Sequence, residues 1–167
     1  MEHMWAPWRI GYITGEEKKF EGCVFCEVVK LNDDEKQYIV HRGKHCYVIL
    51  NRYPYNNGHV MVVPYKHESD LLELADEIQE ECRLMINTTI RALRKVFNPH
   101  AINMGLNMGK AAGAGIEEHI HYHILPRWEG DTNYMPVIAG VKVISESLDA
   151  THKNLVKAFK ELEKLGA

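Results

Sequence analysis

The chain has 167 residues, which is enough for one domain with a substantial hydrophobic core. Its 20 Lys and Arg residues against 23 Asp and Glu residues give a formal charge of −3, so no broad basic surface for nucleic acid is expected and any phosphate ligand must be held locally. No apolar run is long enough to cross a membrane and no secretory signal pattern opens the chain, so the four cysteines indicate thiols or metal ligands in a cytoplasmic protein.

The first part of the chain combines an aromatic segment with a pair of cysteines. Residues 5–13 are aromatic and interrupted by proline, and they either seal the edge of the core or stack on a base. Cys23 and Cys26 form a C-x-x-C pair, the spacing at which two thiolates bind one metal ion from a tight turn. A redox pair is the alternative, but it requires a thioredoxin-like βαβ pattern that this sequence lacks. The pair is half of a zinc site, so two further ligands must come from elsewhere in the chain.

Three strands are predicted in the next part of the chain, in short apolar runs bounded by turn residues. The first two form a hairpin that turns at Gly43-Lys44, and Pro64 ends the third. Their bounds are residues 37–42, 45–50 and 59–63. Cys46 in the second strand and Cys82 in the helix that follows occupy apolar positions, and they are interpreted as small buried hydrophobic residues.

A long amphipathic helix is predicted from about residue 70 to residue 96, because apolar residues recur there every three to four positions. Ser69 or Asp70 is a plausible N-cap, and Pro99 prevents the helix from continuing. A fourth strand follows at residues 101–108, and a second amphipathic helix at residues 149–165.

The chain shows no internal repeat, linker or domain boundary. Residues 1–167 are therefore interpreted as one domain, with an N-terminal extension over residues 1–22 and a C-terminal helical segment over residues 145–167.

A loop of small residues and a run of histidines follow one another near the end of the chain. Residues 109–115 are rich in glycine and alanine, so backbone N–H groups can approach phosphate oxygens closely, although the spacing is not that of a Walker loop. His119, His121 and His123 then alternate with apolar residues, and the period of a β-strand places the three imidazoles on one face, roughly 7 Å apart. Titratable groups that converge beside such a loop are typical of a functional site. A purely structural metal-binding strand is the alternative.

The histidine run resembles a known family motif. His119-x-His121-x-His123, with apolar residues between the histidines, is similar to the motif of the histidine-triad (HIT) superfamily, and the resemblance extends from Cys23 to Pro126. Its other elements are Asn51, Gly58-His59-Val60, His67, Gly105-Leu106-Asn107 and the small-residue loop. Three further segments resemble the bacterial and archaeal branch of this superfamily, near dinucleoside-polyphosphate hydrolases and phosphorylases. They are Trp5 to Arg9, Arg127-Trp128 and Gly130-Asp131.

This resemblance implies both a fold and a set of site residues. The implied fold is of the α+β class, a HIT-like antiparallel sheet of about five strands with two main helices, paired as a homodimer. His121 is the implied nucleophile, His123 the phosphate contact, and His59 the histidine that orders the site. Asn51 is implied to hold the ribose, and Asn107 to lie on the phosphate side.

The resemblance also implies one structural Zn²⁺ per chain. The implied ligands are two cysteines and two histidines: Cys23, Cys26, His67 and His119. The loop is expected to meet phosphate oxygens through Lys110, Gly113 and Gly115. Many relatives carry Gln, Ser or Thr just before the histidine motif, whereas this chain has Gly115 and Ile116.

The chemistry expected of such a site is nucleotidyl transfer. A neutral imidazole can attack the α-phosphorus when its reactive nitrogen is unprotonated, which leaves a nucleotidyl-His121. Water as the second acceptor gives hydrolysis, and inorganic phosphate gives phosphorolysis. Because Gly115 and Ile116 offer a phosphate dianion no side-chain donor, the sequence favours hydrolysis.

The leading hypothesis is therefore a hydrolase of dinucleoside polyphosphates such as diadenosine tetraphosphate. A phosphorylase of the same substrates is the first alternative, and a zinc-stabilised nucleotide-binding module with little catalysis is the second. A nucleic-acid end-processing domain is the third, and the acidic balance of the chain argues against it.

Overall fold

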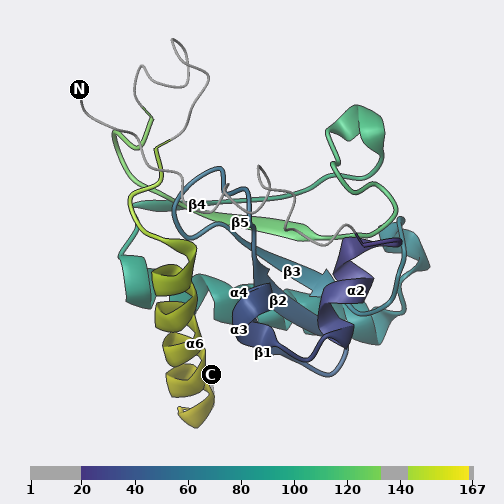
Figure 1. Cartoon of the computed structure of the whole chain (residues 1–167), viewed down its shortest axis with the longest axis horizontal. Helices are drawn as coiled ribbons and strands as arrows, with labels where there is room; N and C mark the ends of the chain where they lie inside the picture. Colours follow the sequence, from purple (N-terminus) through teal and green to yellow (C-terminus); the bar gives the residue numbers. More distant parts are fainter. Residues whose placement is uncertain (1–19, 133–142, 166–167) are drawn as a thin grey trace.

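A five-stranded antiparallel sheet forms the centre of the computed structural model, which describes residues 20–132 and 143–165 (Figure 1). The strand order is β1-β2-β3-β5-β4, and each neighbouring pair is antiparallel. The strands are β1 (Ile39–Arg42), β2 (Cys46–Leu50), β3 (Val60–Pro64), β4 (Ala101–Leu106) and β5 (Tyr122–Arg127). The predicted sheet is confirmed, and each of the four predicted strands begins and ends within two residues of the observed one. The aromatic segment at residues 5–13 lies outside the described residues.

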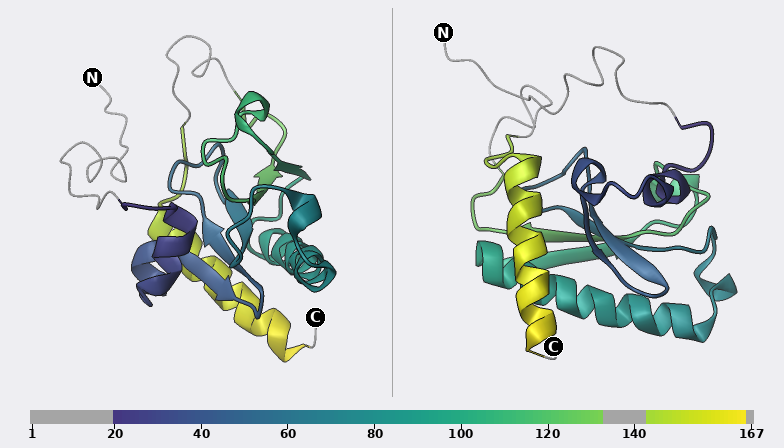
Figure 2. Two further views of the ribbon diagram at one scale, coloured as in Figure 1. Left: turned by 90° about the vertical axis from the view of Figure 1, so that its right-hand side faces the viewer. Right: turned by 60° about the horizontal axis from the view of Figure 1, so that its bottom comes forward.

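The two central strands are buried on both faces. Every residue of β2 and β3 is buried, and alternate side chains contribute to two separate apolar clusters. One cluster joins the sheet to the long helices α4 (Asp76–Phe97) and α6 (Leu148–Lys164), and the other joins it to the short helix α2 (Val24–Lys30). This double burial explains why these strands appear in the sequence as continuous apolar runs. Figure 2 shows α6 crossing α4 beneath the sheet.

Two short helices before the sheet were not predicted. α2 has 7 residues and α3 (Asp34–Gln37) has 4, so neither is long enough to show a helical period in the sequence. α2 begins directly after Cys23, whose backbone oxygen accepts from Cys26 and Glu27. Phe25 and Val28 are its buried residues, and both pack against the sheet.

The predicted long helix is divided into two elements. A 3₁₀ turn, η2 (Leu71–Glu73), precedes α4, and the backbone of Leu74 between them is extended. Asp70 caps the short turn through its side chain, which accepts from Leu72 N–H. Gln79 of α4 then donates to the backbone oxygens of Leu71 and Leu74, so the break is held by hydrogen bonds. The prediction of one continuous helix from residue 70 was therefore wrong, whereas its end near Pro99 was right.

The histidine run is also divided. β5 begins at Tyr122, so His119 and His121 lie before the strand rather than in it. The register pairs Val62 with Tyr122, and Pro64 two residues later has no N–H with which to extend the pairing. Ile120 N–H donates instead to the backbone oxygen of Glu68 at 2.7 Å. The prediction of one strand through all three histidines was wrong for this reason.

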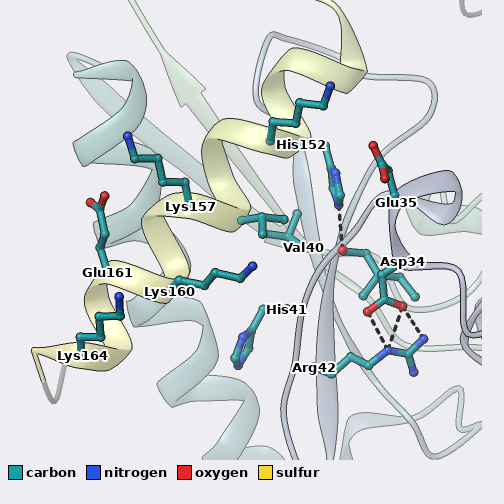
Figure 3. A pocket seen from close by; sticks show the side chains of 13 residues that line it. Asp34, Glu35, Val40, His41, Arg42, His152, Lys157, Lys160, Glu161 and Lys164 are labelled. Carbon is teal, nitrogen blue, oxygen red and sulfur yellow. Dashed lines mark hydrogen bonds and ion pairs between the residues drawn. The ribbon is translucent and has the colours of Figure 1, made fainter.

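The edge strand β1 is covered by helices α6 and α3. Figure 3 shows the groove beside it, a cavity of about 790 Å³. His152 of α6 donates through Nε2 to the backbone oxygen of Ile39 at 2.8 Å, which satisfies a carbonyl at the sheet edge. Arg42 forms a two-pronged ion pair with Asp34 of α3, at 3.0 Å from Nε and 2.8 Å from Nη2. Among the described residues, no helix combines the length and apolar character that a membrane span requires.

Candidate active site and metal centre

The three alternating histidines are shared between two clusters. His119 lies with the C-x-x-C pair and His67, whereas His121 and His123 lie with His59. All three histidines of the run are buried, with exposed fractions of 1%, 4% and 8%. Phe25 of α2 lies beside both clusters, because its ring centroid is 5.5 Å from that of His119 and 4.8 Å from that of His121.

The first cluster has the dimensions of a zinc site. The ligand atoms of Cys23, Cys26, His67 and His119 all lie within 4.8 Å of one another. The sulfur–nitrogen contacts are 3.3–3.5 Å, and the two Nδ1 atoms are 3.3 Å apart. Tetrahedral zinc, with Zn–N near 2.0 Å and Zn–S near 2.3 Å, requires ligand separations of about 3.3–3.6 Å for these pairs. The four residues therefore fit Zn²⁺ both in chemistry and in spacing.

The protonation state of His119 supports the same reading. Its Nε2 lies 2.9 Å from the backbone oxygen of Pro64, which can only accept, so Nε2 carries the proton. Nδ1 then presents a lone pair to the cluster, as a metal ligand must. Burial, followed by the neighbouring Cys23, raises the pKa of Cys26 to about 11 in the metal-free cluster. A bound dication reverses this effect, because it stabilises the thiolate directly.

A backbone carbonyl also determines which ring nitrogen of His121 carries the proton. Its Nδ1 lies 2.8 Å from the backbone oxygen of His119, so Nδ1 donates and Nε2 is left with a free lone pair. Burial lowers the pKa of His121, and the hydrogen bond to His119 opposes this effect. The side chain is therefore a neutral imidazole with an unprotonated Nε2, which is the form that a nucleophile requires.

A chain of hydrogen bonds sets the tautomers of His59 and His123. Tyr55 N–H donates to His59 Nδ1 at 3.2 Å. Because a backbone N–H can only donate, Nδ1 is the acceptor and carries no proton. His59 Nε2 then carries the proton and donates to His123 Nδ1 at 2.9 Å. It follows that Nε2 of His123 is protonated and available as a donor. Burial, followed by the nearby histidines, lowers the pKa of His59 to about 3 and that of His123 to about 4, so both are neutral near pH 7.

His121 and His123 line a cavity of about 340 Å³. Its walls are largely apolar and come from α2, β2, β3 and the residue after the small-residue loop: Val24, Phe25, Val28, Ile49, Leu50, Met61 and Ile116. Asn51, Arg52 and Tyr53 line it after β2, and Gly113 and Gly115 line it from the loop. A largely apolar cavity of this size with a few polar groups fits a flat ring system that carries an anionic group.

Some predicted site residues lie elsewhere. Asn107 and Lys110 are not among the residues that line the cavity, and Lys110 is exposed in the short turn η3 (Lys110–Ala112). Arg127, one of the residues that carry the resemblance, pairs through Nε and Nη2 with Asp131 and through Nη1 with Asn103. Of the loop residues predicted to meet phosphate oxygens, Gly113 and Gly115 line the cavity and Lys110 does not.

Other residues at the site carried no recognisable signal in the sequence. Tyr55 lies over His59 with ring centroids 4.6 Å apart, and Phe25 lies against two histidines. An aromatic residue in a turn or beside a C-x-x-C pair belongs to no motif, so neither could be distinguished from ordinary packing.

Comparisons with known proteins agree with this geometry. The HIT domain family profile matches residues 32–130. A relative from Mycobacterium tuberculosis, named AP-4-A phosphorylase, is 39% identical over 162 residues, an alignment that covers 93% of this chain and 83% of the relative. A hypothetical histidine triad nucleotide-binding protein from Sulfolobus tokodaii superposes with a TM-score of 0.70 at 25% identity, covering 84% of this chain and 94% of that one.

A second solved structure, a Zn-bound histidine triad family protein from Mycobacterium smegmatis, has the same TM-score of 0.70 at 24% identity, covering 86% of this chain and 97% of that one. At that identity the likeness concerns the fold. The family profile spans more than half of the 167 residues and the tuberculosis relative is similar over nearly the whole chain. The histidine run, its two clusters and these matches together establish that the chain belongs to the HIT family.

Proposed function

We propose that this chain is an enzyme that cleaves dinucleoside polyphosphates, such as diadenosine tetraphosphate, at an α-phosphate through a covalent nucleotidyl-His121. The observation that carries the proposal is the lone pair on His121 Nε2, which is fixed by the hydrogen bond from Nδ1 to His119 in a side chain that lines the cavity. Family membership and 39% identity to a protein named AP-4-A phosphorylase support a nucleotide-processing enzyme with this class of substrate.

In the first step, the Nε2 lone pair of His121 forms a bond to the α-phosphorus while the bond to the bridging oxygen breaks. The remaining polyphosphate leaves with the electron pair of that bond. Nδ1 keeps its proton, and the positive charge of the resulting imidazolium is stabilised by the backbone oxygen of His119 at 2.8 Å. His123 donates from Nε2 to a phosphoryl oxygen, where negative charge gathers in the transition state.

The cavity supports a nucleoside beside this centre. Its apolar walls between α2 and β2 fit a base, and Asn51 lies at the end of β2 where a ribose hydroxyl would need a polar partner. Gly113 and Gly115 allow the loop backbone to approach phosphate oxygens, because neither carries a side chain that would fill the space.

The second acceptor distinguishes a hydrolase from a phosphorylase. The sequence favours water, and Arg127 is already paired with Asp131, which removes one donor from a phosphate subsite. The tuberculosis relative, by its name, favours inorganic phosphate. We give more weight to the relative, since similarity over 93% of the chain reflects the whole site whereas the side-chain argument reflects a few positions. We therefore propose phosphorolysis, with hydrolysis as the second candidate.

We also propose one structural zinc ion per chain, held by Cys23, Cys26, His67 and His119. The ion would supply structural cross-linking and no reacting group, because four protein ligands leave it no open position. It would fix His119, and the backbone oxygen of His119 in turn orients His121.

We further propose a homodimer. β4 is an edge strand, and four of its six residues are exposed, including Met104 with an exposed fraction of 59%. An edge strand with an exposed apolar side chain is a ready partner for a second copy of the chain.

The products of diadenosine tetraphosphate test the proposed function. The purified protein is incubated with the dinucleotide, with and without millimolar inorganic phosphate, and the nucleotides are separated by ion-exchange chromatography. Phosphorolysis gives ADP and ATP only when phosphate is present, whereas hydrolysis gives AMP and ATP in both reactions. Two molecules of ADP, or no cleavage at all, would contradict attack at the α-phosphorus.

A further inference from the structure

Asp131 lies 2.6–3.1 Å from five donors at the end of β5. Its carboxylate accepts from Arg127 Nε at 2.6 Å and Nη2 at 2.8 Å, from Trp128 N–H and Thr132 Oγ1 at 3.1 Å each, and from Asn56 Nδ2 at 2.7 Å. The side chain is only 8% exposed. Arg127 holds the pKa of Asp131 far below its usual range, so the group is an anion throughout the working range of the protein. We propose that Asp131 is a positioning residue that sets the tautomers of His59 and His123 through Asn56, an inference that rests on the proposed function.

Asn56 connects this carboxylate to the segment between β2 and β3. It is 7% exposed, and its amide donates both to Asp131 and to the backbone oxygen of Pro126 at 3.1 Å. The backbone oxygen of Asn56 accepts from His59 N–H at 3.2 Å. Gly58 lies in the same turn with φ +74°, and a Cβ there would be 3.0 Å from Pro126, so the turn is packed closely against β5.

Two donor groups lie at His59 Nδ1: the backbone N–H of Tyr55 at 3.2 Å and the side-chain Nδ2 of Asn51 at 3.4 Å. Tyr55 N–H donates to His59 Nδ1, and this bond exists only while the peptide between residues 54 and 55 keeps its orientation. The side chain of Asn56 donates to both Asp131 and Pro126, and these bonds hold the next peptide, between residues 55 and 56, in place. Asp131 therefore acts on His59 through two residues of backbone, without touching it.

The consequence appears at His123. With Tyr55 N–H in place, His59 Nε2–H donates to His123 Nδ1, and His123 Nε2–H faces the cavity as a donor. If His59 takes the other tautomer, its Nε2 lone pair faces His123, which must then carry its proton on Nδ1. The Nε2 of His123 would present a lone pair to an anionic phosphate, which repels the substrate charge instead of stabilising it.

The test compares Asp131→Asn and Asp131→Ala with a matched control, Asp34→Asn. Asp34 forms a comparable two-pronged pair with Arg42, but at the opposite edge of the sheet (Figure 3). The zinc-loaded full chain is labelled with ¹⁵N-histidine, and two-bond ¹H–¹⁵N spectra report which ring nitrogen of each histidine carries the proton. Steady-state rates on diadenosine tetraphosphate with inorganic phosphate give kcat and KM, and a thermal melt gives the folded fraction.

In the wild type we expect His59 protonated on Nε2 alone. In Asp131→Ala we expect a mixture of tautomers at His59 and His123 and a kcat lower by about 10-fold, with KM changed by less than about twofold. Asp131→Asn, which keeps an acceptor oxygen, should lie between the two and serves as the readout if the alanine variant does not fold. Asp34→Asn should lower the melting temperature without changing either tautomer.

Wild-type tautomers in both folded Asp131 variants, or an equal tautomer shift in Asp34→Asn, would overturn the proposal. The spectra do not depend on turnover, so the two proposals can fail separately. If the wild-type protein does not cleave the dinucleotide but the Asp131 variants still shift the tautomers, the proposed function fails and the positioning role stands.

Discussion

The pH dependence of the first chemical step is a direct consequence of the buried histidines. In the proposed mechanism the neutral form of His121 is the nucleophile, so activity is lost as pH falls through the pKa values in the folded protein. Burial lowers the pKa of His121, and it lowers those of His59 and His123 to about 3 and about 4. We therefore expect the fall in rate to begin below the usual pKa of imidazole, near 6.5.

The size of the effect follows from the fraction of neutral imidazole. At pH 5.5, a histidine with an ordinary pKa near 6.5 is about 9% neutral, whereas one with a pKa of about 4, as for His123, is about 97% neutral. The rate at pH 5.5 relative to pH 7.5 should therefore exceed the value of about one tenth that an unshifted His121 would give.

The assay is the single-turnover release of the first nucleotide from diadenosine tetraphosphate, with excess protein and constant ionic strength. This readout precedes the second acceptor, so titration of inorganic phosphate does not enter it. Circular dichroism and zinc content at each pH separate a loss of fold or metal from a loss of chemistry. A tenfold fall between pH 7.5 and pH 5.5, in protein that stays folded and metal-loaded, would refute the assignment of neutral, burial-shifted histidines.

The other predictions concern the nucleophile, the metal and the assembly. His121→Asn should keep nucleotide binding by calorimetry but lose at least about 10⁴-fold in turnover, whereas His123→Asn should lose less, because a donor is easier to replace than a nucleophile; equal mild losses would point to a different nucleophile. Cys23→Ser should reduce the zinc content below one ion per chain and lower the melting temperature sharply, since structural zinc contributes on the order of 10 kcal/mol to folding. Cys82→Ser changes a buried cysteine outside the cluster and should keep the metal. A wild-type protein that contains no zinc, and whose melting temperature is the same with and without chelator, would contradict the site. Sedimentation at micromolar concentration should give a dimer, and Met104→Arg on the exposed edge of β4 should shift it toward the monomer; a monomeric wild type would exclude the dimer.

The fold could be predicted well wherever local sequence pattern and burial agree. β2 and β3 appear as continuous apolar runs because both of their faces are covered, and α4 and α6 show one apolar stripe each. The break before α4 could not be predicted in the same way. Leu74 continues the apolar spacing and is buried, yet its backbone is extended, because hydrogen bonds from Gln79 stabilise the interruption.

The family resemblance implied a separate role for each histidine of the run, but the strand period alone did not separate them. The motif names His119, His121 and His123, and the C-x-x-C spacing names two metal ligands. Equal alternation along a strand would give the three histidines equal environments. Pro64 ends the ladder instead, and the segment before β5 turns His119 into the cysteine cluster and leaves His121 at the cavity.

By itself, the sequence determined the sheet, the two long helices and the family resemblance, because strand and helix periods and motif spacing are properties of neighbouring residues. The tertiary structure alone decided which nitrogen of each imidazole carries a proton. That choice depends on a backbone oxygen or N–H that faces a particular ring atom, which Pro64, His119 and Tyr55 supply. By our proposal, it also depends on Asp131, which holds the peptide of Tyr55 through Asn56 although it lies many residues away in the chain. Hydrogen bonds to the backbone are available at every position of a chain, so no residue pattern can specify them before the chain has folded.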